Sequence, residues 1–225
     1  MTDQENNKPD LIYTVVEKIA ISADDAMAVA CGYKKQVLEK NSNLSKTSAQ
    51  KIVAQKIIDR YSKISATSGA ATSLTSIVPG LGTAVSIAAG GTMDVAISMK
   101  LQVDMVMCLA AAYDYDLNNE DAKHMSFLIA GLGALEQTGT TQASKLASKA
   151  GVKMVERYLK GAALETIKQI FKAIGINFTK AALKKALPFG IGVIVSSTTN
   201  YTLTKFVGKQ ALEWFICDAD HKKAA

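Results

Sequence analysis

The sequence predicts an all-α protein, and three observations support this fold class. Aromatic residues make up only 6% of the chain, whereas alanine, leucine and lysine, which favour helices, are common. Prolines occur at only three positions, Pro9, Pro79 and Pro188. Apolar residues recur at helical spacing in successive segments. We therefore expect a compact bundle of roughly nine or ten helices.

The length and composition predict one domain. With 225 residues, of which 48% are hydrophobic, the chain can bury a sizeable core. We expect this domain to cover residues 9–217, between a disordered N-terminal tail (residues 1–8) and a charged C-terminal tail (residues 218–225). Its expected parts are a group of N-terminal helices, a hydrophobic hairpin and a group of C-terminal helices, at residues 9–63, 64–116 and 119–217.

The N-terminal part is predicted to hold three helices with recognisable starts. Pro9 suits a first helical turn, where its missing N–H is not needed. Ser22 followed by Asp25 resembles a capping box and predicts a second helix that runs to about Lys40. Ser45 is expected to cap the third helix.

The 30 residues from Ile64 to Met93 contain no charged side chain. Proline lacks a backbone donor and displaces the preceding residue from the α region, so we expect a buried hairpin of two close-packed helices bent at Pro79, Gly80 and Gly82. Each arm has about 15 residues, whereas a membrane-spanning helix needs roughly 20. Two alternatives stay open: a domain that hides the hairpin and can expose it at a membrane, or a purely soluble interaction module.

Several further helices are expected after the bend. The second arm of the hairpin is predicted to extend over residues 82–113, and a helix is expected to open near Asn118. Another is expected from about Ala143, with interruptions at Gly161 and Gly175.

A second proline-glycine corner is formed by Pro188, Gly190 and Gly192, and the final helix is expected to run from there to Cys217. Four identities relate the two corner regions at an offset of 110 residues. Internal duplication, and the independent use of two similar corners for structural reasons, explain these identities equally well.

A polar strip is predicted on the second arm of the hairpin. Asp94, Ser98 and Gln102 are spaced i, i+4 and i+8, and Lys205 is a candidate partner for the carboxylate. The strip is either a polar track or interhelical lock, or a satisfied or exposed face of a soluble helix. Lys100 and Asp104, also four residues apart, are expected to form an ordinary exposed pair.

A basic surface is predicted on the helix expected from about residue 143. Its members are cations at successive helical steps, Lys145, Lys149, Lys153, Arg157 and Lys160. An anionic lipid surface or an acidic partner would relieve their mutual repulsion. The opposite side carries Leu146, Ala150, Val152, Val155 and Leu159, so the helix is amphipathic. The alternative interpretation is a solvated face over a helical core.

The sequence offers little chemistry for catalysis or cofactor binding. The corner "PGLGTA" lacks the lysine and the preceding strand of a phosphate loop, so no nucleotide is expected. The two histidines, His124 and His221, lie in different regions, and we expect them on the surface without a metal. Three distant cysteines predict no disulfide framework, and no nucleic-acid module is recognisable. We therefore expect no enzymatic activity, no cofactor and no nucleic-acid partner.

Two blocks of the sequence resemble the bacterial EcsC family. In residues 78–116 the resemblance rests on a proline-glycine corner, an acidic position, an "LQ" pair and a closing tyrosine and aspartate: Pro79, Gly80, Gly82, Asp94, Leu101, Gln102, Tyr113 and Asp116. Asp114 stands where the family pattern has a glycine. In residues 187–215 the matching positions are Pro188, Gly190, Gly192, Asn200, Thr204, Gly208 and Ala211. The resemblance implies a helical protein, sometimes encoded beside an ABC transporter, without an established enzymatic activity.

The net charge of +6 is compatible with an anionic membrane or an acidic partner. The polar, acidic N-terminus is unlike a secretory signal, so we expect a cytoplasmic protein that acts at the inner face of the cell membrane. Conditional insertion and lipid binding are the two expected modes of action, alongside a transport or secretion system. The alternative is a soluble module that binds a protein partner without touching a membrane.

Overall fold

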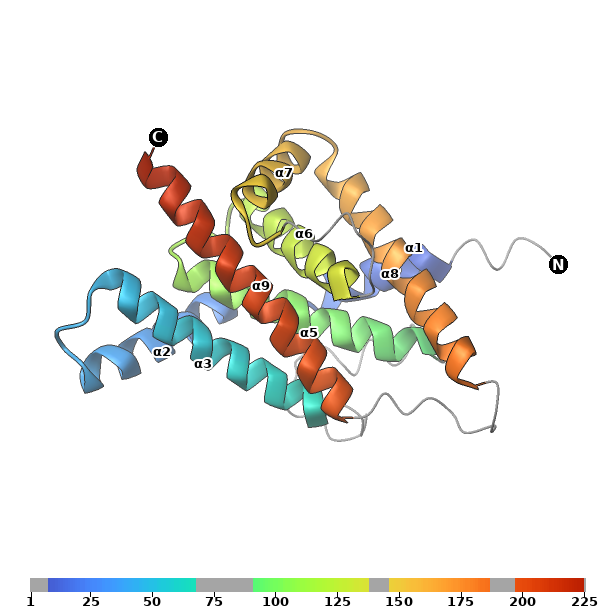
Figure 1. Ribbon diagram of the computed structural model, residues 1–225, viewed down its shortest axis with the longest axis horizontal. Helices are drawn as coiled ribbons and strands as arrows, with labels where there is room; N and C mark the ends of the chain where they lie inside the picture. The colour runs from blue at the N-terminus through green and yellow to red at the C-terminus, as the bar shows by residue number, and fades with distance from the viewer. Residues whose placement is uncertain (1–7, 68–90, 138–145, 187–196, 225) are drawn as a thin grey trace.

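The computed structural model describes residues 8–67, 91–137, 146–186 and 197–224, and these residues form eight helices and no strand. The predicted all-α class is confirmed (Figure 1). The helices are α1 (Lys8–Ile19), α2 (Ala23–Lys40), α3 (Lys46–Thr67), α5 (Gly91–Ala112), α6 (Glu120–Gln137), α7 (Lys149–Lys160), α8 (Ala163–Ala186) and α9 (Ser197–Ala224).

Local capping fixes the starts of the N-terminal helices as the sequence predicts. The Asp25 backbone N–H donates to Ser22 Oγ at 3.1 Å, and this hydroxyl donates to the Asp25 carboxylate at 2.7 Å. The Ser48 N–H likewise donates to Ser45 Oγ at 3.2 Å. Both serines satisfy backbone donors that have no partner within the helix.

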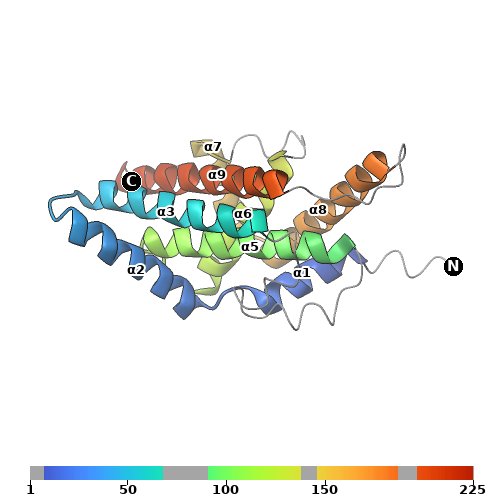
Figure 2. The same ribbon diagram turned by 90° about the horizontal axis from the view of Figure 1, so that it is seen from below.

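Helix α5 lies at the centre of the bundle. It contacts every other described helix except α7, and Figure 2 shows it between the α3–α9 pair and the helices α1 and α2. Every residue from Val95 to Ala110 is buried, because this helix is predominantly apolar all round and its charged residues Lys100 and Asp104 pair with each other inside the core.

By length and composition, α5 is also the one described helix that could cross a membrane, over the 18 residues Val95–Ala112. In this fold 94% of that window is buried inside the protein. The core helix of a bundle passes the same test, so this finding by itself is weak support for a span.

Helices α3 and α9 pack side by side in opposite directions (Figures 1 and 2). Ser65, near the end of α3, donates to the Asn200 carbonyl at 3.2 Å and accepts from Thr204 Oγ1 at 2.8 Å. Gly208 allows the close approach, because a Cβ atom there would lie 2.9 Å from Ile58 Cγ1 and from Met105 Sδ. A side chain at this position would overlap the core.

The structure differs from the predicted boundaries in the C-terminal half. Helix α7 begins at Lys149 instead of near Ala143, because Ser148 caps it by accepting from the Gly151 N–H at 3.3 Å. Helix α8 continues through Gly175, where an interruption was expected. The absence of a side chain there admits Ile12 of α1, whose Cδ1 would lie 2.7 Å from a Cβ atom.

The final helix also extends beyond its predicted end at Cys217. Helix α9 runs to Ala224, so the residues expected to form a charged tail are helical up to that point. Asp218 is buried, and it forms an ion pair with Lys222 one turn later at 2.9 Å. Both side chains also contact the Tyr115 hydroxyl in the turn after α5, and so connect the last turns of α9 to the rest of the fold.

Both predicted corners lie outside the described residues. This holds for all six of their positions: Pro79, Gly80, Gly82, Pro188, Gly190 and Gly192.

Candidate functional site

The predicted polar strip is only partly within the described side chains. The side chain of Asp94 lies outside them, whereas Ser98 and Gln102 are buried on α5. Gln102 Nε2 donates to Ser98 Oγ at 3.3 Å, and Gln102 Oε1 has no hydrogen-bond partner among the described residues. Neither residue lies on a solvent-exposed face. The candidate partner Lys205 forms an ion pair with Asp59 of α3 at 3.7 Å.

The pair of Lys100 and Asp104 is buried, so the prediction of an exposed pair is wrong. Their side chains are 1% and 4% exposed, and the ammonium donates directly to Asp104 Oδ2. The other carboxylate oxygen, Oδ1, accepts the Ile21 backbone N–H at 2.8 Å. The i, i+4 spacing of two such residues is the same in an exposed pair and a buried one, so spacing alone could not reveal the burial.

Burial dominates the electrostatics of this pair. It raises the pKa of the Asp104 carboxyl above its ordinary value, while Lys100 and the Ile21 N–H oppose the increase. Removing two charges from water is costly unless they satisfy one another. Asp104 therefore does two things at once: it neutralises Lys100 and holds the turn between α1 and α2 against α5.

A buried thiol lies one turn further along α5. Cys108 is within 3.5 Å of the Tyr61 hydroxyl on α3. Burial raises the pKa of the Cys108 thiol to about 12. Because the thiolate is the reactive form of cysteine, this side chain is protonated and unreactive near neutral pH.

Lys100 and Asp104 line a groove of about 790 Å³ between α2, α3, α5 and the turn that follows α1. Half-buried apolar side chains form much of its wall, including Ile21, Val29 and Ile64. This volume falls within the usual range for a small-molecule site. We call it the α2–α3 groove.

Two cations also line the α2–α3 groove, Lys18 of α1 and Arg60 of α3. Both are exposed, and neither has an ion-pair partner among the described residues. Apolar walls combined with unpaired cations suit the binding of an amphipathic anion. This groove is not predictable from the sequence, because it depends on the docking of the α1–α2 turn onto Asp104.

The predicted basic surface is largely present on α7. Lys149, Lys153, Arg157 and Lys160 are exposed, while Lys145 lies outside the described residues. We call these four exposed cations the α7 basic face. None of them forms an ion pair within the part of the chain that the structure describes.

The apolar side of α7 is already used in the core. Val152 and Val155 are 1% and 0% exposed, and α7 packs on α6, α8 and α9. Ala150, which was predicted to lie on the apolar side, is exposed.

Potential metal ligands do not converge anywhere in the described ranges: no group of three or more histidine, cysteine, aspartate or glutamate side chains is placed to hold an ion. His124 and His221, both expected on the surface, are half-buried. The Nε2 atom of His124 lies 3.7 Å from the Glu120 carboxylate.

The family comparison agrees with the resemblance seen in the sequence. The model of the EcsC protein family matches residues 12–215, which include α5, the α2–α3 groove and the α7 basic face. No curated protein and no solved structure gives a significant match.

Proposed function

Because the chain belongs to the EcsC protein family, we propose that it is a non-enzymatic helical protein that acts at the surface of an anionic membrane. The observation that carries this proposal is the α7 basic face, four exposed cations on one helix without an ion-pair partner among the described residues. Like charges at helical spacing repel one another, and a negatively charged leaflet would relieve this repulsion.

The expected binding is weak and sensitive to salt. A lysine or arginine near a charged leaflet contributes about 1 kcal/mol, so the four residues would contribute about 4 kcal/mol, which corresponds to a dissociation constant of about 1 mM. Contacts between exposed charges are screened at a Debye length of about 10 Å in 0.1 M salt. A second signal, from a partner or a bound lipid, would therefore strengthen the attachment in a cell.

The proposed mode is peripheral docking. Val152 and Val155 are committed to the core, so α7 can present its charges to a membrane without inserting an apolar side. Insertion of α5 would require 94% of its apolar window to leave its buried surroundings. Anionic lipids give the cytoplasmic leaflet its negative surface potential, so we place the protein at the inner face of the cell membrane.

Flotation with vesicles tests the proposal. The protein should float with vesicles that contain phosphatidylserine or phosphatidylglycerol at low salt, and remain in the bottom fraction with neutral phosphatidylcholine vesicles. A variant with glutamate at Lys149, Lys153, Arg157 and Lys160 should no longer float with anionic vesicles.

A matched variant controls for net charge. It carries glutamate at four lysines of α2 and α3 that form no ion pair among the described residues: Lys40, Lys51, Lys56 and Lys63. This control should float almost as well as the wild type. Equal loss in both variants, or equal recovery of the wild type with neutral and anionic vesicles, would contradict docking through α7.

The α2–α3 groove favours a second candidate function, that of a soluble module that binds an amphipathic anion or a protein partner. Native mass spectrometry of the purified protein tests this candidate. A co-purified acyl chain that is lost in an Arg60→Glu variant would favour it, and a preparation free of bound molecules would favour the membrane proposal.

A further inference from the structure

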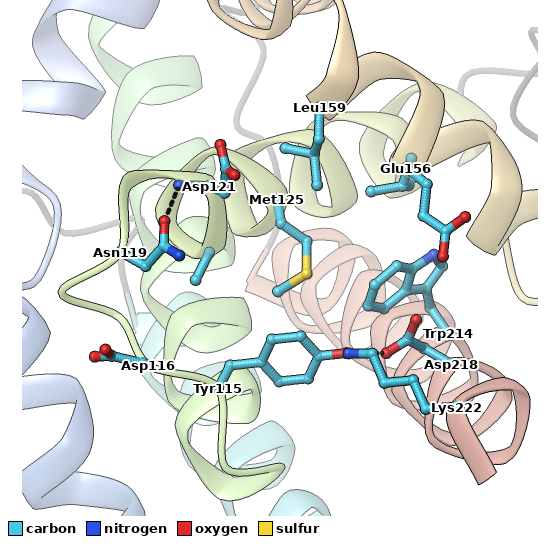
Figure 3. A pocket seen from close by; sticks show the side chains of 12 residues that line it. Tyr115, Asp116, Asn119, Asp121, Met125, Glu156, Leu159, Trp214, Asp218 and Lys222 are labelled. Atoms are coloured by element: carbon cyan, nitrogen blue, oxygen red, sulfur yellow. Dashed lines mark hydrogen bonds and ion pairs between the residues drawn. The ribbon is translucent and has the colours of Figure 1, made fainter. Parts of the chain in front are cut away.

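A second pocket, of about 260 Å³, lies between the turn after α5, helices α6 and α7, and the last turns of α9. Figure 3 shows the side chains that line it. Tyr115 and Trp214 provide aromatic surface, and Met125 and Leu159 provide apolar contacts. Membrane docking through α7 requires none of these four side chains.

One of the side chains that line this pocket is a lysine, Lys222, whose ammonium is held by its neighbours. Lys222 Nζ lies 2.9 Å from Asp218 Oδ2, 3.0 Å from the Tyr115 hydroxyl and 4.4 Å from the centre of the Tyr115 ring. Figure 3 shows the three groups converging at one point. The Tyr115 hydroxyl also donates to Asp218, which orients the two oxygen acceptors. Carboxylate, hydroxyl and aromatic face together form a typical environment for an ammonium group.

The acceptors are fixed, whereas the ammonium is exchangeable. The Asp218 side chain is 4% exposed and the Lys222 side chain is 62% exposed. Water can solvate the ammonium of such an exposed lysine, so Lys222 can exchange with another cation that pairs with Asp218. The carboxylate would then stay buried and require another cation.

Two further observations indicate that the pocket suits a ligand. Three more carboxylates line it, Asp116, Asp121 and Glu156, so its charge is strongly negative even with Lys222 in place. The indole N–H of Trp214 is buried and has no hydrogen-bond partner among the described residues. Buried donors normally have a partner, so a compound that carries an acceptor atom in addition to its ammonium group would satisfy this donor.

We propose that this pocket binds a primary ammonium compound in the place that Lys222 now occupies, with Asp218 and Tyr115 as the acceptors. The ammonium comes from a small free amine or from a lysine side chain of a partner protein. This site is separate from the α7 basic face and has the opposite charge, so its existence does not depend on membrane docking.

The only tryptophan of the chain is Trp214, which makes its fluorescence a specific reporter of the pocket. We would titrate n-pentylammonium into the wild type and into a Lys222→Met variant, with 1-pentanol as the neutral probe of similar shape. The variant should bind the ammonium about fivefold more tightly than the wild type, because the internal competitor is gone. The alcohol should cause little change in either protein.

A Lys223→Met variant is the matched control. It removes the same charge from the neighbouring residue, which is exposed and whose Nζ atom lies 3.9 Å from Asp220 Oδ1. Its affinity for n-pentylammonium should equal that of the wild type. An equal gain in both variants would show a general charge effect and would overturn the proposal.

Variants of the acceptors complete the test in the Lys222→Met background. Asp218→Asn should abolish binding of the ammonium, and Tyr115→Phe, which retains the ring, should weaken binding severalfold. Circular dichroism verifies that each variant is folded. If Asp218→Asn does not fold, the result for Tyr115→Phe decides. Unchanged affinity in the folded acceptor variants, or equal responses to the amine and the alcohol, would overturn the proposal. Spermidine and an acetylated lysine tripeptide amide then distinguish a free amine from a protein partner as the source.

Discussion

At the scale of single residues, Asp114 shows how one position combines backbone strain with favourable charge. It is the one non-glycine residue with a positive φ in the described segments, at 64°, and it ends α5. The Tyr115 N–H donates to the Ala110 carbonyl at 3.0 Å and the Asp114 N–H to the Ala111 carbonyl at 3.1 Å, which is a Schellman motif. The family pattern has a glycine here, as the left-handed conformation favours.

The side chain of Asp114 offsets part of this strain. It forms ion pairs with Lys34 at 3.3 Å and Lys46 at 2.6 Å. We predict that Asp114→Ala will destabilise the protein by about 1 kcal/mol more than Asp114→Gly, because both lose the ion pairs but only alanine keeps the backbone strain. Urea denaturation of the two variants measures the difference. Equal stabilities would contradict the strain argument.

The contribution of the Asp114 ion pairs should depend on pH. Partial burial alone would raise the pKa of its carboxyl, but Lys46 and Lys34 together lower the pKa below the ordinary value of 3.8. A lowered pKa in the folded state stabilises the protein above pH 3.8, and this contribution is lost as the pH falls through the folded value. The stability difference between the wild type and Asp114→Ala should therefore be larger at pH 6 than at pH 3. A stability difference that is the same at both pH values would contradict a lowered pKa of Asp114 in the folded state.

At the scale of helices, α5 carries a buried ion pair, that of Lys100 and Asp104. Removal of one partner from a buried pair leaves an uncompensated charge. We predict that Lys100→Met will destabilise the protein by about 3–5 kcal/mol, and that the double variant Lys100→Met/Asp104→Leu will recover most of this loss. Chemical denaturation of the three proteins measures the free energies of unfolding.

The double variant also distinguishes packing from function. If the double variant regains its stability but no longer binds a ligand in the α2–α3 groove, the buried charges serve that groove. A double variant as unstable as Lys100→Met would mean that the hydrogen bond from Ile21 to Asp104 is itself essential to the fold.

The contact between α3 and α9 depends on one missing side chain. We predict that Gly208→Ala will destabilise the protein by about 1–3 kcal/mol, because a Cβ atom would overlap Ile58 and Met105. The control is Gly32→Ala in α2, where a Cβ atom would have nothing within 4 Å. Since alanine favours helices over glycine by about 1 kcal/mol, this control should stabilise the protein. Thermal denaturation should show a lower melting temperature for Gly208→Ala and a higher one for Gly32→Ala than for the wild type.

At the scale of the whole molecule, the sequence predicted what local rules determine. The structure confirms three such predictions: the all-α class, the caps at Ser22 and Ser45, and the end of α5 near Tyr113. All three follow from local spacing and capping chemistry. The α2–α3 groove could not be predicted, because it requires three segments that are distant in the sequence to meet. The same holds for the pocket proposed to bind an ammonium group, where the Tyr115 hydroxyl contacts Lys222, which lies 107 residues later in the chain.

The whole fold also sets limits on how the protein can meet a membrane. The α7 basic face is already exposed, while α5 is enclosed by the other helices. The proposed docking through α7 would therefore leave the core unchanged, whereas insertion of α5 would require the bundle to open. Local opening of this kind is measurable as loss of amide protection.

Hydrogen exchange with and without anionic vesicles tests this account most directly. Docking predicts that amides of α7 exchange more slowly when the vesicles are present, while amides of Val95–Ala112 in α5 keep their protection. Loss of protection throughout α5, or an α7 whose exchange is unaffected by the vesicles, would contradict it.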